Sequence, residues 1–488
     1  MRCAALVLIS IVLIAFASTI SRPVNGGPVE IENRILRSVD YVLSQYHSGN
    51  GVAGFLHSGQ GAGTSRFYTE DNALIALALS SYQATHFSTR YYSNLKDAIE
   101  SVLRAQTPQG DFHEYYDFQN STWGLNGKMF CWNAYAVMGP AYAAYAVTTT
   151  QTNPESSYWL QIVNELRLFI DGWVKKSQDH DGAVIFSFAD GAQSKDVGCN
   201  GILLMGLMYV AAFEFDSGDK AAATEYAGIS EGIANWLYSF QELNETSWGR
   251  GGFYTDSSRD VQGSFENALC MFGLNAYYKA ISLIIPSLRT SLESFRQAQK
   301  MWADTYEEKI LDEWGGVSFS RTSSGLNSYP KTSDDAAVIL AAMVDVWVNL
   351  GPPIYWNDSA RIYAWMIGNN ERGLDLQAPT GSFLFGFDQN QVLAQSNITT
   401  TTLVLYSLIQ AQFISIPGQY PVGGISTTTR SRITASSQLS ATTTAAQASQ
   451  PLNSNFVHVI AGLLLAIVAS SIVAVLYIKR GKTRRKRR

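Results

Sequence analysis

A regular internal repeat limits the folds that this chain can adopt. An apolar, helix-like segment begins six times, at an asparagine or at a residue that replaces it: Asn72, Asn133, Asn200, Asn267, Asp335 and Thr401. The differences between these successive sequence numbers are 61, 67, 67, 68 and 66. Such regular self-similarity indicates one supersecondary unit that stacks on copies of itself.

A second marker precedes each of these segments. It is a glycine-bearing turn that ends in an apolar residue, at a similar distance ahead of each repeat position: Phe55, Phe112, Val184, Phe253, Val317 and Phe383. Glycine permits a sharp turn where a Cβ atom would clash. We expect each turn to connect the two helices of one hairpin.

The helices on the two sides of each turn differ in character. The segment "NELRLFIDGWV", which precedes the third turn, has apolar residues at spacings of three and four, which is typical of a helix with one buried face. The segment "NGILLMGLMYVAAF", which follows it, is apolar nearly all round and predicts a helix that is buried on every side.

Twelve helices of these two kinds predict an all-α fold in which an inner ring of buried helices lies within an outer ring of amphipathic ones. An open solenoid is the alternative. The number of repeats, the lack of a polar face on the inner helices and the lack of polar end repeats favour the closed toroid.

This pattern resembles the (α/α)6 toroids of the six-hairpin glycosidase superfamily over residues 30–417 approximately. The resemblance rests on the architecture, so no residue is carried over from any one family. It implies a site at the mouth where the inner helices begin, and a carbohydrate substrate. The same toroid also serves sugar epimerases, polysaccharide lyases, prenyltransferases, terpene cyclases and lanthionine cyclases, so that the fold alone is a weak guide to function.

Residues 1–21 predict a secretory signal peptide, because one arginine precedes an apolar run that ends in the small-residue cleavage pattern "AFA". A retained N-terminal anchor is the alternative. We assign the toroid to residues 28–417. Sequons at Asn120, Asn244, Asn357 and Asn397 fit an external glycoprotein, although each is weak alone.

The C-terminal part predicts a membrane anchor. Residues 418–455 are dominated by Ser, Thr, Ala and Gln and indicate an extended stalk. Residues 456–478 include the uncharged run Val457–Ile478, which is long enough to span a bilayer as a helix. The basic tail, residues 479–488, places that end in the cytoplasm and the toroid outside the cell. Nucleic-acid binding by the tail is less favoured than contact with anionic lipid.

The charge distribution narrows the choice of ligand. The body holds all 40 Asp and Glu but only 23 of the 35 Lys and Arg, which gives it a net charge of −17. A body this acidic argues against nucleic acid as a partner and is compatible with neutral substrates.

Carboxylates recur at the start of the predicted inner helices. The residue before the repeat position is Asp71 in the first repeat, Glu266 in the fourth and Asp334 in the fifth, with Glu70 and Asp335 as neighbours. A closed ring would bring them together at its mouth. Helix capping is the alternative for each of them, because free N–H groups at a helix start also stabilise a carboxylate.

Glycoside hydrolysis requires two carboxyl groups, one protonated and one ionised, about 5 Å apart for retention or about 6.5–9.5 Å apart for inversion. We expect Glu266 to be the general acid and Asp334 or Asp335 the base, with Asp71 facing them. Mutual repulsion would raise the pKa of one of these acids. The sequence therefore predicts a hydrolase without a cofactor or a bound metal.

Aromatic residues in the turns are candidates for binding sugar faces: Tyr68, Tyr116, Trp123, Trp248, Trp314 and Tyr329. Packing beneath the turns is an equal alternative for these rings.

Other functions remain open at this stage. A non-catalytic glycan receptor would show the acids in salt bridges or pointing outward. An epimerase or lyase would need His57, His113 or Tyr68 as the base at the mouth. A zinc site built from His57, His113 or His180 with Cys131 or Cys199 lacks any recognisable spacing of metal ligands. Cys131 and Cys199 could instead form a disulfide, with Cys270 free and buried.

Overall fold

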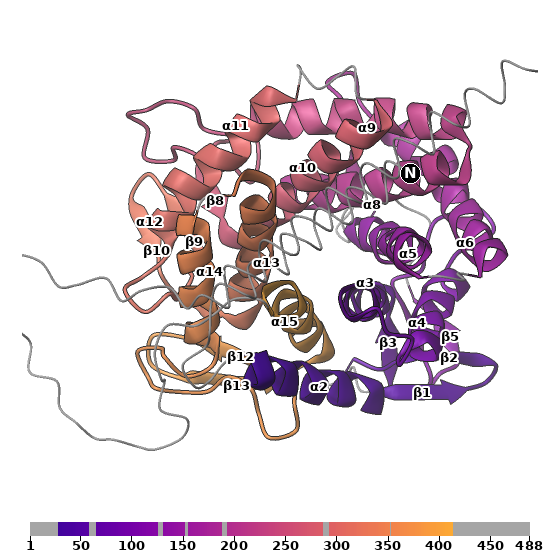
Figure 1. Cartoon of the computed structure of the whole chain (residues 1–488), viewed down its shortest axis with the longest axis horizontal. Helices are drawn as coiled ribbons and strands as arrows, with labels where there is room; N and C mark the ends of the chain where they lie inside the picture. Colours follow the sequence, from indigo (N-terminus) through magenta and orange to yellow (C-terminus); the bar gives the residue numbers. More distant parts are fainter. Residues whose placement is uncertain are drawn as a thin grey trace, which may run out of the picture. The chain divides into compact units, whose positions relative to one another are not determined.

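Helices dominate the computed structural model and form two concentric rings (Figure 1). The inner ring consists of α3 (Thr69–His86), α5 (Cys131–Thr150), α8 (Val197–Ser217), α10 (Ser264–Ile284), α13 (Ser333–Leu350) and α15 (Ile398–Ala411). The outer ring consists of α2 (Pro28–Ser44), α4 (Tyr92–Arg104), α6 (Ser156–Phe169), α9 (Lys220–Ser239), α11 (Glu293–Met301) and α14 (Pro353–Met366). Two outer helices continue through π-helical turns, α6 into η1 (Ile170–Val174) and α7 (Lys175–Ser177), and α11 into η3 (Trp302–Glu307) and α12 (Glu308–Ile310).

The structure describes residues 28–57, 65–124, 130–151, 155–187, 193–285, 292–351 and 353–412. All of them belong to one structural unit. The predicted signal peptide, stalk, membrane-spanning helix and basic tail therefore fall outside the described residues. Among the described helices, α8 is long and apolar enough to span a bilayer, but 94% of its apolar window is buried in the core of the ring.

The inner ring is closed. Each inner helix packs against the next one along the chain, and the last, α15, packs against the first, α3. The helices approach closely where small residues meet. A Cβ atom on Gly139 of α5 would lie 2.1 Å from the carbonyl oxygen of Ala73 in α3, and one on Gly273 of α10 would lie 2.4 Å from that of Gly201 in α8. The closed toroid predicted from the repeat is thus confirmed, and the open solenoid is excluded.

In the first four hairpins, the asparagine at the repeat position hydrogen-bonds the turn to the inner helix. In the fourth hairpin, Asn267 Oδ1 accepts the backbone N–H of Phe253 at 2.7 Å, and Asn267 Nδ2 donates to the carbonyl of Phe253 at 2.9 Å. Asn72 and Asn200 make the same pair of bonds to Phe55 and Val184. These asparagines are fully buried, so their recurrence has a structural cause.

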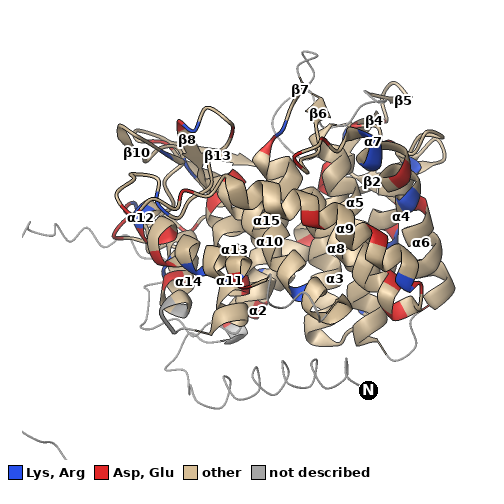
Figure 2. Ribbon diagram, turned by 90° about the horizontal axis from the view of Figure 1, so that it is seen from above, with Lys and Arg blue, Asp and Glu red and all other residues tan. Residues whose placement is uncertain are grey.

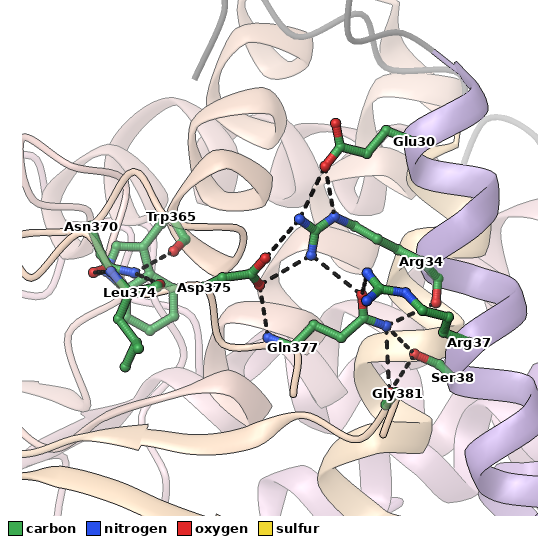
Figure 3. Close-up of polar contacts among 10 residues, drawn as sticks. All are labelled: Glu30, Arg34, Arg37, Ser38, Trp365, Asn370, Leu374, Asp375, Gln377 and Gly381. Carbon is green, nitrogen blue, oxygen red and sulfur yellow. Dashed lines mark hydrogen bonds and ion pairs between the residues drawn. The ribbon is translucent and has the colours of Figure 1, made fainter. Parts of the chain in front are cut away.

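A glutamine fastens each of four hairpins to the next one. Gln106, Gln178 and Gln241 each donate from Nε2 to a glycine carbonyl in their own turn and to a carbonyl of the following outer helix, at 2.8 to 2.9 Å. Gln377 of the last hairpin makes the corresponding bonds to Gly381 and to Arg34 in α2, the first outer helix (Figure 3).

An ion pair strengthens the same seam between the last and first hairpins. The buried guanidinium of Arg34 lies 2.8 Å from Asp375 and 3.1 Å from Glu30 (Figure 3). Gly381, with φ of +93°, lies so close to α2 that a Cβ atom would be 2.1 Å from the carbonyl oxygen of Arg37. The last hairpin is therefore joined to the first by the same kind of glutamine hydrogen bonds that join neighbouring hairpins inside the ring.

Short antiparallel strands in the connections were not predicted from the sequence. They form five small sheets: β1 (Tyr46–Gly49) with β2 (Val52–Phe55), β3 (Arg66–Tyr68) with β4 (Tyr115–Asp117) and β5 (Thr122–Trp123), β6 (Phe186–Ser187) with β7 (Gln193–Ser194), β8 (Val261–Gly263) with β9 (Ser320–Thr322) and β10 (Gly325–Asn327), and β11 (Lys331–Thr332) with β12 (Leu384–Phe387) and β13 (Val392–Ser396). β3, β8 and β11 each lead directly into an inner helix. Figure 2 shows most of the strands along one end of the helical body.

Candidate functional site

The predicted acids lie at the N-terminal ends of the inner helices, beneath the small sheets. Glu70 and Asp71 are in the first turn of α3, Glu266 in that of α10, and Asp334 and Asp335 in that of α13. No ion pair to Glu70, Glu266, Asp334 or Asp335 occurs within the described ranges. The negative charges are therefore not neutralised by neighbouring Lys or Arg side chains.

The charge of Asp334 acts on Glu70 although 264 positions of sequence separate them. Burial raises the pKa of Glu70 to about 8, and the charges of Asp71, Glu114 and Asp334 add to the rise. Burial likewise raises the pKa of Asp334 to about 6, with a contribution from Asp71 and an opposing one from the Thr400 hydroxyl. The ring thus gathers the acids of α3 and α13 into one electrostatic cluster.

Asp334 is half-buried, and its buried Oδ1 atom makes no well-formed hydrogen bond among the described residues, although the Thr400 hydroxyl is near enough to lower the pKa of the carboxyl. A buried acid oxygen without a good hydrogen bond costs free energy, by about 1–3 kcal/mol or more. A hydroxyl or water molecule that donates to it would relieve this cost, which makes Asp334 suited to bind or activate a donor.

Asp335 lies at the repeat position itself, where other hairpins have asparagine. It is buried, its Oδ2 accepts the Thr332 hydroxyl at 2.6 Å, and its own N–H donates to Thr332 Oγ1 at 3.0 Å. Burial raises the pKa of Asp335 to about 8, and Asp334 and Glu266 add to the rise. Asp335 is therefore buried at the repeat position like the asparagines, but it bonds to Thr332 at the start of its own helix, whereas Asn267 bonds to its turn.

Glu266 lies over the starts of two inner helices. A Cβ atom on Gly263 would be 1.9 Å from Glu266 Oε2, and one on Gly198 would be 3.5 Å from its Cγ. Gly263 therefore makes room for this side chain, and Gly198 lies in ordinary contact with it. Burial raises the pKa of Glu266, its own backbone N–H opposes the rise, and Asp196 adds to it.

Asp71 is held from two sides. Its Oδ2 lies 2.8 Å from Nδ1 of His57, and its Oδ1 accepts the hydroxyl of Thr399 at 2.5 Å. The His57 side chain is 30% exposed, and its hydrogen bond to Asp71 raises its pKa. Asp71 and His57 thus form an oriented pair that faces solvent through the imidazole.

Two residues of the mouth were missed by the sequence reasoning. Asp196 caps α8 by accepting the N–H of Cys199 at 2.7 Å, and burial raises its pKa. Asp196 lies four positions before Asn200, whereas the alignment compared only the residue directly before each repeat position. The sequence "KDVGC" ahead of an apolar run is a helix-capping signal that could have identified it. Tyr135 of α5 is buried, and the charges of Glu70, Asp196, Glu266 and Asp334 all reach it.

The predicted aromatic residues have different environments. Tyr116 is buried among the rings of Phe67, Phe118 and Trp123, which favours the packing alternative for it. Trp123 is half-buried and stacks on His113. Tyr68 is half-buried with its ring edge-on to His57, beside the mouth.

The three other predicted aromatics lie on the connections of the fourth and fifth hairpins. Trp248 has the guanidinium of Arg321 5.7 Å from its ring centre. Tyr329 donates to Glu371 at 2.7 Å, and Trp314 is half-buried against the core. Among the described residues, no hydrogen bond or ion pair joins any of these three side chains to a mouth carboxyl.

Cys131 and Cys199 form a disulfide between the starts of α5 and α8, and Cys270 is free and buried. The pairing removes both thiols considered for a zinc site. No group of three or more His, Cys, Asp or Glu side chains in the described ranges is arranged to hold a metal ion.

A groove of about 830 Å³ adjoins the mouth between the third and fourth hairpins. Ile185, Trp236 and Phe240 provide its apolar lining, and Lys195, Asn235 and Asp256 contribute polar groups. Lys195 directly precedes Asp196, and the charge of Asp256 adds to the raised pKa of Asp196. The groove therefore lies near Asp196 at the start of α8.

No protein-family model matches the sequence, and no curated protein matches it. The fold is nevertheless shared with solved structures. A D-mannose isomerase matches with a TM-score of 0.58 and 13% identity, over 80% of this chain and 99% of that one. The cellobiose 2-epimerase of Bacillus thermoamylovorans matches with a TM-score of 0.60 and 10% identity, over 79% and 98%.

A third match is an α-1,6-mannanase of Salegentibacter sp. in complex with α-1,6-mannotriose, with a TM-score of 0.52 and 12% identity over 78% of this chain and 99% of that one. That structure is of an inactive variant in which two adjacent aspartates are replaced by asparagine. The chain described here therefore has the (α/α)6 toroid fold of six-hairpin glycosidase-like enzymes.

Proposed function

We propose that this toroid is a carbohydrate-active enzyme that hydrolyses a glycosidic bond at its mouth, with Glu266 as general acid and Asp334 as base. The observation that carries the proposal is the cluster of unpaired carboxyls that α3, α10 and α13 bring together, whose pKa values are raised to different extents. Pairs of acids with separated pKa values are the requirement of glycoside hydrolysis.

The division of roles follows from the surroundings of each acid. Asp334, with a pKa of about 6, is ionised at neutral pH and has an oxygen without a well-formed hydrogen bond, as a base that activates water requires. Burial and Asp196 favour the protonated form of Glu266, which is the form that donates to a leaving oxygen. Asp335 is the weaker candidate for the base, because its burial at the repeat position gives it a structural role.

The fold neighbours support a sugar substrate without identifying it. They include enzymes that isomerise, epimerise or hydrolyse sugars, and the mannanase complex holds a mannose trisaccharide. The adjacent acids Asp334 and Asp335 are the same residue combination that the inactive mannanase variant lacks. The groove beside the mouth is large enough for a sugar residue and has the mixed apolar and polar lining of ligand sites.

A sugar isomerase or epimerase is the second candidate function. It is favoured by one observation, the hydrogen bond of 2.8 Å between His57 and Asp71 at the mouth. A carboxylate that orients an imidazole supports its action as a base on a C–H group next to a carbonyl. Incorporation of deuterium from solvent into a sugar, lost in His57→Gln and kept in Glu266→Gln, would select this function over hydrolysis.

A glycan receptor without activity is less favoured. The acids of the mouth are free of salt bridges to Lys and Arg within the described ranges, whereas binding alone does not require unpaired buried carboxyls.

The cellular placement is part of the proposal. A cleaved signal peptide and the helix Val457–Ile478 would display the toroid outside the cell, on a membrane anchor with a cytoplasmic tail. The Cys131–Cys199 disulfide is compatible with an oxidising compartment. Protease digestion of intact cells should remove the body and leave the tail protected; protection of the body would contradict this placement.

The activity is tested by incubating the full-length protein in detergent with a panel of polysaccharides and oligosaccharides and measuring new reducing ends. Glu266→Gln and Asp334→Asn should each abolish the release. The matched control is Glu231→Gln on the exposed face of α9, which should retain it. Full activity in Glu266→Gln would remove the acid assignment.

A further inference from the structure

Three cationic side chains lie on neighbouring segments of the fourth and fifth hairpins although the body is strongly acidic, and the Thr305 hydroxyl, one turn before Lys309, donates to the carbonyl of Arg250 at 3.1 Å. Arg250 lies in the turn before β8, Lys309 is on α12, and Arg321 is on β9. The positive charges of Arg321 and Arg250, together with desolvation, lower the pKa of Lys309. Like charges held together in this way destabilise the unliganded protein.

We call Arg250, Lys309 and Arg321 the Arg250–Arg321 cluster. Carboxylates do not neutralise its charge. In the part of the chain that the structure describes, no acid lies within ion-pair distance of Arg321 or Lys309. Arg250 has Glu245 at 3.7 Å, but that acid is 83% exposed, and the other nearby acid is the exposed Glu308 next to Lys309. Other half-buried cations have a close acidic partner where Arg321 has none, for example Lys195 with Asp179 and Lys279 with Asp345, each at 2.7 Å.

The cluster also has hydrogen-bond donors without acceptors. Nη1 of Arg321 and Nε of Arg250 are both buried and have no partner among the described residues. A buried charged donor without an acceptor is costly, by about 1–3 kcal/mol or more. The face of Trp248 lies 5.7 Å from the Arg321 guanidinium and helps to fix its position.

The cluster is connected to the acid site through β8 and β9. Arg321 of β9 lies directly opposite Gln262 of β8. Gln262 is in turn four positions before Glu266 in the sequence. The Tyr306 hydroxyl is 3.5 Å from the Gln262 carbonyl, and the charges of Glu266, Asp335 and Arg321 all act on this tyrosine. A ligand bound at the mouth therefore has a positively charged neighbour at the side of the fourth and fifth hairpins.

We infer that Arg250, Lys309 and Arg321 bind one oxyanion, namely a sulfate, phosphate or carboxylate group carried by a sugar at the mouth. Guanidinium groups bind such oxyanions through charge-assisted, bidentate hydrogen bonds, and the lysine adds a flexible charge. The oxyanion site stands on the cluster itself, whereas its assignment to a sugar rests on the proposed function. A single substituted sugar also fits the acidic body better than a polyanion does.

The test is binding of a singly sulfated disaccharide and its unsulfated counterpart to the full-length protein in detergent, by calorimetry at constant ionic strength. Inorganic sulfate is titrated against chloride in parallel. We expect the sulfated sugar to bind at least ten-fold more tightly than the unsulfated one. Lys309→Gln and Arg321→Gln should each lower the ratio of the two affinities, sulfated over unsulfated, by at least ten-fold. Each should also weaken the binding of inorganic sulfate.

Lys300→Gln is the matched control, because Lys300 is an exposed lysine of the same outer helix that pairs with Asp304. It should leave the preference intact. Lys309 is exposed, so its variant should fold even if Arg321→Gln does not. Equal affinity for the two disaccharides, or an equal loss in the Lys300 control, would overturn the inference.

The outcome is separable from that of the proposed function. The binding measurements are repeated in Glu266→Gln, where turnover is expected to be absent. Preference for the sulfated sugar without any hydrolysis by the wild type would uphold the oxyanion site and reject the hydrolase. Hydrolysis of neutral glycans with no preference for the sulfated sugar would uphold the hydrolase and reject the oxyanion site.

Discussion

The side-chain amide of Gln377 donates to the carbonyl of Arg34 at 2.9 Å, across 343 positions of sequence. The same bond links the interior hairpins, from Gln106 to Glu165, from Gln178 to Ile229 and from Gln241 to Ala298. The first and last hairpins are therefore joined as the others are. Because closure brings α3, α13 and α15 side by side, it also produces the acid cluster at the mouth.

Replacing Gln377 by leucine should loosen the seam of the ring. The change removes hydrogen bonds to Arg34, Ser38 and Gly381 in a buried site, so the free energy of unfolding should fall by about 2–3 kcal/mol. Hydrogen exchange of α2 should accelerate. Gln106→Leu removes the equivalent bonds between the second and third hairpins and should destabilise similarly without accelerating exchange in α2; the same exchange pattern in both variants would contradict the closure role.

Changing Asp335 to asparagine should stabilise the protein increasingly as the pH rises. Its pKa is about 8 when folded, above the ordinary value of 3.8, so the folded state holds the proton more tightly. Stability from this group is therefore greatest below about pH 4 and declines as the pH rises towards 8. Asparagine avoids this loss and restores the residue type of the first four repeats.

The gap between Asp335→Asn and the wild type should widen by up to about 1.4 kcal/mol per pH unit between pH 5 and 8, measured by denaturant unfolding. The exposed Asp260→Asn controls for the loss of one negative charge. If Asp335 is structural, its variant keeps activity. A gap that stays constant between pH 5 and 8 would show that Asp335 is ionised in the folded state.

Removing the disulfide should destabilise the mouth. Cys131 and Cys199 are separated by 68 positions, and closing a loop of that length typically contributes about 2–4 kcal/mol. The Cys131→Ser, Cys199→Ser double variant should unfold at lower denaturant concentration and lose activity at a lower temperature. Alkylation of unfolded, unreduced protein should modify Cys270 and spare the other two; modification of all three would disprove the pairing.

The fold could be predicted from the sequence because the residues that specify it recur in successive repeats. Asn72, Asn133, Asn200 and Asn267 recur for one physical reason, the bonds that each makes to its turn, and the buried inner helices lack a polar face. The small sheets could not be predicted, because strands this short leave no recognisable alternation.

The candidate site was predictable in part. Alignment on the repeat position placed Glu266 and Asp334 at the mouth, but it could not separate Asp334 from Asp335, since their different burial depends on packing in three dimensions. The contacts of His57 and Thr399 with Asp71 join residues from different hairpins, which no local pattern reveals. Asp196 was missed because it caps its helix one turn earlier than the aligned residues.

The central claim is that Glu266 protonates the leaving group. The most direct measurement compares kcat/KM of the wild type and Glu266→Gln on two substrates of the same sugar, one with a sugar leaving group and one with nitrophenol. Nitrophenol leaves without protonation, so loss of a general acid should cost about 10²–10⁴-fold on the glycan and less than ten-fold on the nitrophenyl glycoside. Equal losses on both substrates, or none on either, would contradict the assignment of Glu266 as the acid.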